Sequence, residues 1–116
     1  LGIGPFIVSA PIERKMGLSA ISQLAVQPDT FFTPDWCKSN GLFAEVFEEA
    51  EAMDAALAKL AEKLAGYNPE AMAEMKKVFW RNCDNWDNLL EDRARISGEL
   101  VLSDFTRDFI KKFKNH

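Results

Sequence analysis

Histidine and cysteine are scarce in this 116-residue chain. Its one histidine is the last residue, His116, so the chain lacks the residues for a histidine-based catalytic triad or a metal site with several histidines. The two cysteines, Cys37 and Cys83, do not have the CxxC spacing of zinc and redox sites. We therefore expect two reduced, half-buried thiols in a cytoplasmic protein, while a disulfide between them stays open at this point.

Long apolar runs and an excess of basic residues are also missing. The longest uncharged stretch, residues 16–28, has 13 residues, whereas a helix needs about 20 to cross a bilayer, so we predict no transmembrane helix. No basic segment precedes the apolar residues 3–10, and we predict no signal peptide there. The net charge of −4 argues against nucleic acid or an anionic membrane as the main partner.

The residues that are present make an ordinary globular composition, 47% hydrophobic and 28% charged. Proline divides the chain, because only Pro69 of the five prolines lies after residue 47. We therefore separate residues 1–47, with short elements, from residues 48–116, with helix almost throughout. A chain of this length can bury about two thirds of its unfolded surface, so we expect one core.

Up to three short helices are expected in the first part. A helix over residues 10–16 would end at Gly17, and the apolar spacing of residues 18–25 predicts a second helix. Thr33-Pro34 is typical of a capped helix start, and Gly41 would stop that helix.

The second part is expected to form four helices, and because their connections are short we expect mainly antiparallel neighbours. The first of these helices would end at Gly66, and the second would begin at Asn68-Pro69. The third would run from Trp86 to Ser97 or Gly98, and the fourth would begin at Ser103-Asp104. The only strand candidate precedes them, at residues 42–47. The predicted fold class is mainly α, with about four to six helices and at most one short strand near residues 42–47.

Acidic residues are numerous, but their spacing does not indicate a site. The four glutamates between residues 45 and 51 lack the spacing of an EF-hand loop and are explained as charges at a helix start. Glu91 and Asp92 are adjacent, so on a helix they point about 100° apart and cannot share a proton. We expect them to pair with Arg93 and Arg95 instead, and we predict no metal ligand and no cofactor.

A phenylalanine seam near the end of the chain is the most unusual apolar feature. Phe105, Phe109 and Phe113 recur every four residues, so they lie on one face of a helix and require a cover. The cover could be the other helices or a neighbouring subunit. The basic residues beside the seam could be solvated partners of the helix dipole or could hold a phosphate. They are Lys111, Lys112 and Lys114.

Several stretches, taken in order, resemble the C-terminal part of the crotonase superfamily, the enoyl-CoA hydratases and isomerases. Five segments carry the likeness. Residues 1–5 resemble the family's LGxxP step, residues 13–20 its RxxG-xxxA turn and helix, and residues 40–47 its AxxxGLVxxV strand. Residues 58–76 resemble its LAxxLAxxNPxAxxxxK segment, and residues 103–112 resemble its closing SxDxxEGxxAFxxKR segment. The sequence is most similar to a methylglutaconyl-CoA hydratase-like subgroup in four segments, IGPF, ERKMG, MKKVFW and ISGELVLSDFT. Residues 1–47 would then be the end of the crotonase core, and residues 48–116 its helical assembly region.

The resemblance implies a parent enzyme that acts on a 2-enoyl-CoA thioester through an enolate and assembles as a trimer. In the family, the oxyanion hole and the catalytic glutamates lie upstream of the position where Leu1 aligns, so no catalytic residue is expected here. Phe109 and Lys112 match the AFxxKR segment, which in the family lies near the adenine and phosphates of CoA. Phe113 replaces the arginine of that segment, and residues 6–10 replace a GGTxxL run.

From this resemblance we expect a cut or processed chain, the C-terminal part of such an enzyme and inactive alone. Its role would be packing, homo-oligomer assembly and one wall of the CoA site, with the acyl-CoA substrate as the partner of the parent. The alternative is an autonomous acidic helical module that works by protein–protein contact. An autonomous module would bury its phenylalanine seam and be a stable monomer, whereas a severed region would self-associate.

Overall fold

Residues 2–114 of the chain are described by a computed structural model, in which they form six helices and no strand. The mainly α fold class is thus confirmed. The helices are α1 (Ser9–Val26), α2 (Pro34–Ser39), α3 (Ala50–Ala65), α4 (Pro69–Phe79), α5 (Trp86–Val101) and α6 (Asp104–Lys114). Leu1 and His116, both named above, lie outside the described residues.

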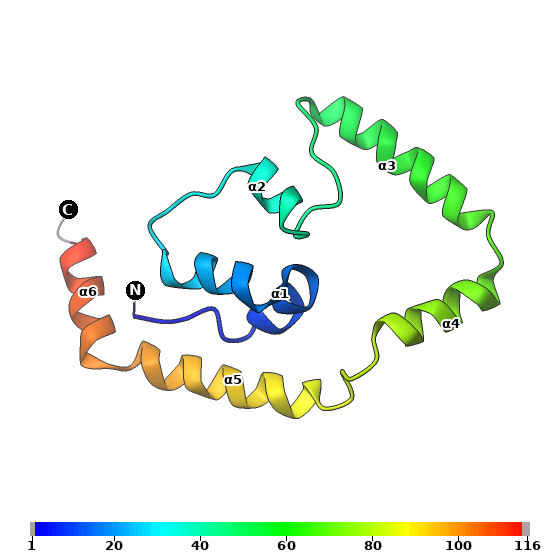
Figure 1. Cartoon of the computed structure of the whole chain (residues 1–116). Coiled ribbons are helices and arrows are strands. Elements are labelled where there is room, and N and C mark those ends of the chain that lie inside the picture. The colour runs from blue at the N-terminus through cyan, green and yellow to red at the C-terminus, as the bar shows by residue number, and fades with distance from the viewer. Residues whose placement is uncertain (1, 115–116) are drawn as a thin grey trace.

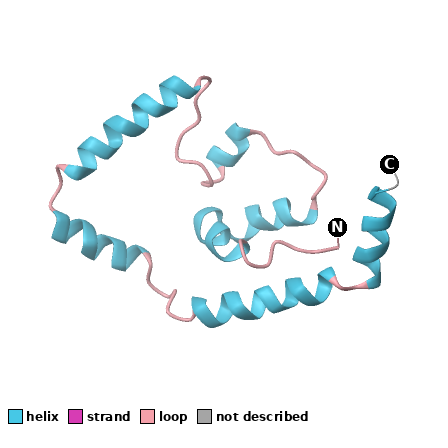
Figure 2. Cartoon of the chain, turned by 180° about the vertical axis from the view of Figure 1, so that it is seen from behind, coloured by secondary structure: helices cyan, strands magenta, loops and turns pink. Residues whose placement is uncertain are grey.

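The helices are arranged as an open arc rather than a bundle. Helices α3 to α6 follow one another end to end, and α1 and α2 lie inside the curve (Figure 1), as the view from behind also shows (Figure 2). The radius of gyration is 18.8 Å, whereas a compact domain of this length has about 13 Å. The expected antiparallel packing is therefore wrong. A short connection determines where the next helix begins, but the direction of that helix depends on contact between apolar faces. The apolar faces of α3 and α4 do not contact each other.

The core is correspondingly small. Among residues 2–114 the buried apolar side chains are Ala10, Ala20, Ile21 and Cys37. The accessible surface is 9512 Å², against about 6,400 Å² for a compact monomer of this size. The expectation of one core that buries two thirds of the unfolded surface is wrong for this chain alone, because its apolar stripes do not face one another.

Local signals fix the first two helices. Gly17 has a φ of 78° and a ψ of 163°, which breaks α1 into two segments at the predicted position. The hydroxyl of Thr33 accepts a hydrogen bond from the backbone N–H of Trp36 at 3.1 Å and caps α2. Gly41, with a φ of 81°, ends α2 in a Schellman turn, because its N–H donates to Lys38 and that of Leu42 donates to Cys37.

The predicted strand at residues 42–47 is not formed. The N–H groups of Leu42 and Phe43 both donate to the carbonyl of Cys37, at 2.9 and 3.4 Å, and so belong to the end of α2. A strand also needs a second strand to pair with, and the described part of the chain contains none. Residues 42–47 therefore form the loop that leads to α3.

The helices of the second part begin where the sequence predicts. The side-chain oxygen of Asn68 accepts from the N–H groups of Glu70 at 2.9 Å and Ala71 at 3.2 Å, which caps α4. Helix α5 differs, because it continues through Gly98 to Val101. The ion pair between Arg95 and Glu99, at 2.7 Å, spans Gly98 and stabilises the helix across it.

Candidate functional site

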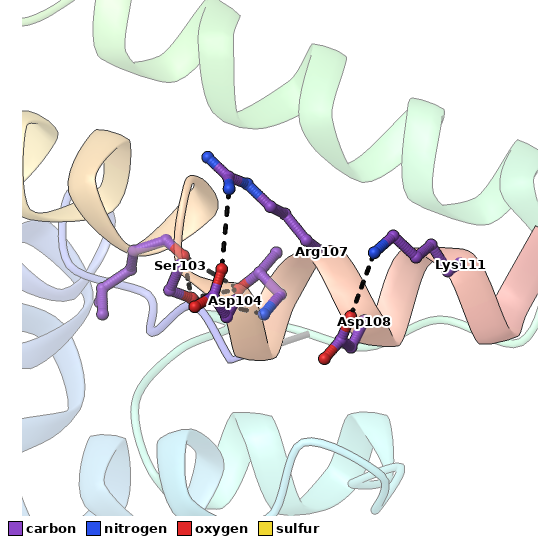
Figure 3. Close-up of polar contacts among 7 residues, drawn as sticks. Ser103, Asp104, Arg107, Asp108 and Lys111 are labelled. Carbon is purple, nitrogen blue, oxygen red and sulfur yellow. Dashed lines mark hydrogen bonds and ion pairs between the residues drawn. The ribbon is translucent and has the colours of Figure 1, made fainter.

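Helix α6 contains Phe109 and Lys112, the two residues that the sequence analysis assigns to a CoA-binding site. Its start is fixed by a hydroxyl cluster: Ser103 accepts from the N–H of Thr106 at 3.3 Å, and the Thr106 hydroxyl donates to the carbonyl of Leu100 at 2.9 Å. Thr106 is fully buried. Figure 3 shows this start and the ion pairs that follow along the polar face of the helix, Asp104 with Arg107 and Asp108 with Lys111.

Phe109 and Lys112 lie three residues apart on α6 and so neighbour each other on its surface. Phe109 is 40% exposed and lines an apolar hollow of about 440 Å³ together with Ile110, Phe113 and Lys114. Lys112 is exposed and does not itself line the hollow; it makes no ion pair with any described residue, whereas its neighbour Lys111 pairs with Asp108 at 3.3 Å. The arrangement offers an apolar surface with an uncompensated ammonium group at its edge.

The described residues supply only one side of this candidate site, namely the surface of α6. The residues that line the hollow all belong to α6. The other two phenylalanines of the seam are more exposed than Phe109, at 68% for Phe105 and 75% for Phe113. Gly2 of the N-terminal segment lies against the ring of Phe105, but most of the surface of Phe105 and Phe113 stays exposed among the described residues. A ligand or a second polypeptide would have to cover the rest of the seam.

A second apolar surface, which the sequence analysis did not identify as a site, lies on α3. Met53, Leu57 and Leu60 face outward and, with Ala44 and Phe47 of the preceding loop, line a hollow of about 400 Å³. The spacing of the α3 residues was visible in the sequence. What it could not show is that the loop of residues 42–47 folds against this face and that none of the other described helices covers it.

Of the glutamates expected at a helix start, Glu49 and Glu51 lie at the start of α3, whereas Glu45 lies in the preceding loop. The ammonium group of Lys38 donates to the carboxylate of Glu45, and this hydrogen bond and the positive charge lower the pKa of Glu45 below its usual 4.5. Among residues 2–114, no group of three or more histidine, cysteine, aspartate or glutamate side chains could hold a metal ion.

The predicted partners of Glu91 and Asp92 are only partly found. Arg95 lies 4.0 Å from Asp92 and 2.7 Å from Glu99, and the pair with Glu99 raises the pKa of Arg95. Arg93 pairs with neither acid, because it points toward the N-terminal segment instead. No local sequence pattern predicts that long-range contact.

Two remaining sequence predictions concern the thiols and the membrane. Cys37 and Cys83 are free thiols, the first buried and the second half-buried. Of the helices that the structure describes, none combines the length and the apolar character that a bilayer crossing requires.

Comparison of the chain with models of protein families, with curated proteins and with solved structures finds no match.

Proposed function

We propose that this chain is the C-terminal region of an enoyl-CoA hydratase/isomerase-like enzyme. The parent would add water to, or isomerise, a 2-enoyl-CoA thioester through an enolate, in the cytoplasm, where free thiols such as Cys37 and Cys83 persist. The chain itself would supply packing, homo-oligomer assembly of the trimer type and one wall of the CoA site. No residue of the chain is assigned a catalytic role.

The observation that supports this proposal most directly is the uncovered apolar surface. The total accessible surface of the chain, 9512 Å², exceeds that of a compact monomer of this size by about 3,000 Å². An excess of that size is comparable with the area that obligate assemblies bury. A chain that normally packs against the rest of an enzyme and against neighbouring subunits is expected to have such a surface.

The CoA wall is proposed for Phe109 and Lys112. Phe109 presents an apolar ring on which a flat heterocycle can stack, and Lys112 has no carboxylate partner among the described residues. An ammonium group on a flexible stem suits a phosphate as a point charge. Adenine and phosphate groups together make the chemistry of the CoA end of the substrate, which agrees with the resemblance.

Substitution of Lys112 tests this assignment. In the full-length parent, Lys112→Ala is expected to raise the KM for the CoA thioester about threefold to tenfold and to leave kcat unchanged, because the contact acts on binding alone. Lys111→Ala is the matched control, since Lys111 is already paired with Asp108. An unchanged KM for Lys112→Ala, or an equal rise in both variants, would remove Lys112 from the site.

The alternative, an autonomous acidic helical module, requires the phenylalanine seam to be buried within the chain. The exposure of Phe105 and Phe113 weighs against it. Sedimentation of the 116-residue chain separates the two: the proposal expects a self-associating species, and the alternative expects a stable monomer.

A further inference from the structure

A polar cavity of about 340 Å³ lies between α1 and the start of α5. Both views show these two helices side by side, although they are far apart in the sequence (Figures 1 and 2). The polar and aromatic groups in its lining come from α1, from the loop before α5 and from α5 itself. They are Glu13, Arg14, Asn82, Asn85, Trp86 and Arg93.

The two arginines of this cavity are held by neutral partners. Arg14 donates through Nη2 to the carbonyl of Phe79, and its guanidinium lies 5.9 Å from the centre of the Trp80 ring. Arg93 donates through Nη1 to the hydroxyl of Ser9 at 2.9 Å and to the carbonyl of Phe6 at 3.3 Å. Neither arginine forms an ion pair within the described residues, although acids outnumber bases in the chain.

Of the three other arginines, Arg95 and Arg107 pair with carboxylates of their own helix, whereas Arg81 donates to the carbonyl of Val78 and does not line the cavity. A guanidinium carries five N–H donors, and the contacts above use one nitrogen of Arg14 and one of Arg93. The two side chains are therefore oriented, while most of their donors have no protein acceptor and neither charge is paired with a carboxylate of the described residues.

We propose that this cavity binds a small oxyanion, a carboxylate or a phosphate group, between Arg14 and Arg93. The fork of donors on each guanidinium matches the oxygens of either group, and the amides of Asn82 and Asn85 can donate to the same oxygens. Glu13 adds one negative charge to the lining, which favours a ligand that also carries a hydroxyl or amino donor. The inference is independent of the function proposed above, because neither Phe109 nor Lys112 lines this cavity.

Titration of the full 116-residue chain with inorganic phosphate tests the site, with the indole N–H resonance of Trp86 as the reporter. We expect a saturable shift at Trp86 and none at Trp36, which lies in α2 and does not line the cavity. Arg14→Gln and Arg93→Gln should each weaken binding at least about tenfold, since each removes charge-assisted hydrogen bonds. Arg95→Gln and Arg107→Gln, the matched controls, should leave it unchanged.

Arg93 also contacts the N-terminal segment, so Arg93→Gln could lose phosphate binding through a disturbed fold. Glu13→Gln is the variant that distinguishes this outcome from loss of the site. Removal of the Glu13 charge should tighten phosphate binding about twofold to fivefold, a change that unfolding cannot produce. A second titration with acetate at matched ionic strength shows whether the cavity prefers a carboxylate or a phosphate group. A response to phosphate, acetate or both supports the oxyanion site and gives its class. A response no greater than that to chloride, or equal losses in the control variants, would overturn the proposal.

Discussion

Leu57→Asp is expected to weaken self-association of this chain by about 100-fold. Leu57 is 62% exposed and lies in the centre of the α3 hollow, between Met53 and Leu60. If this face is covered by a second polypeptide, the substitution removes the burial of a leucine and places a carboxylate in an apolar contact. Sedimentation equilibrium across a concentration series measures the change in the association constant.

Ala55→Asp is the matched control for this prediction. It introduces the same charge into the same helix, but residue 55 lies on the side of α3 opposite the apolar stripe. Association of Ala55→Asp should equal that of the unmodified chain. Equal weakening by both substitutions would mean that charge alone, and not the α3 face, controls assembly.

Gly41→Ala is expected to open the contact between α1 and α2. Gly41 has a φ of +81°, and a Cβ at this position would lie 2.9 Å from the carbonyl oxygen of Lys15 in α1. Alanine therefore adds a backbone clash to the cost of a left-handed conformation, together about 2 kcal/mol. Hydrogen exchange should show protection of the α2 amides reduced by about 30-fold.

Gly98→Ala is the companion to this variant. Gly98 lies inside α5, and nothing lies within 4 Å of the Cβ that alanine would add. Helix propensity favours alanine there by about 1 kcal/mol, so protection in α5 should rise. Loss of protection in both variants, or none in Gly41→Ala, would contradict the close approach of Gly41 to α1.

The elements that could be predicted are those set by neighbouring residues. The break at Gly17 and the caps at Thr33 and Asn68 each depend on a few residues and appear where expected. The strand at residues 42–47 failed because pairing depends on a distant partner. The contact of Arg93 with Ser9 spans 84 residues, and no local pattern encodes it.

The candidate site follows the same division. The sequence placed Phe109 and Lys112 on one helix, which α6 confirms, because that placement follows from helical spacing. It could not give the open arc, since the apolar stripe of α3 is equally compatible with an internal or an external partner. The cavity between Arg14 and Arg93 was also missed, because it arises where α1 lies against α5.

The central claim is that this chain belongs to a longer acyl-CoA enzyme, and the reading frame upstream of the Leu1 codon tests it most directly. We expect the frame to stay open and to encode a glutamate within a few residues, preceded by a glycine-rich segment and a second glutamate. These would supply the proton transfers and the oxyanion hole that enolate chemistry requires. A start codon immediately beside the Leu1 codon would contradict the claim.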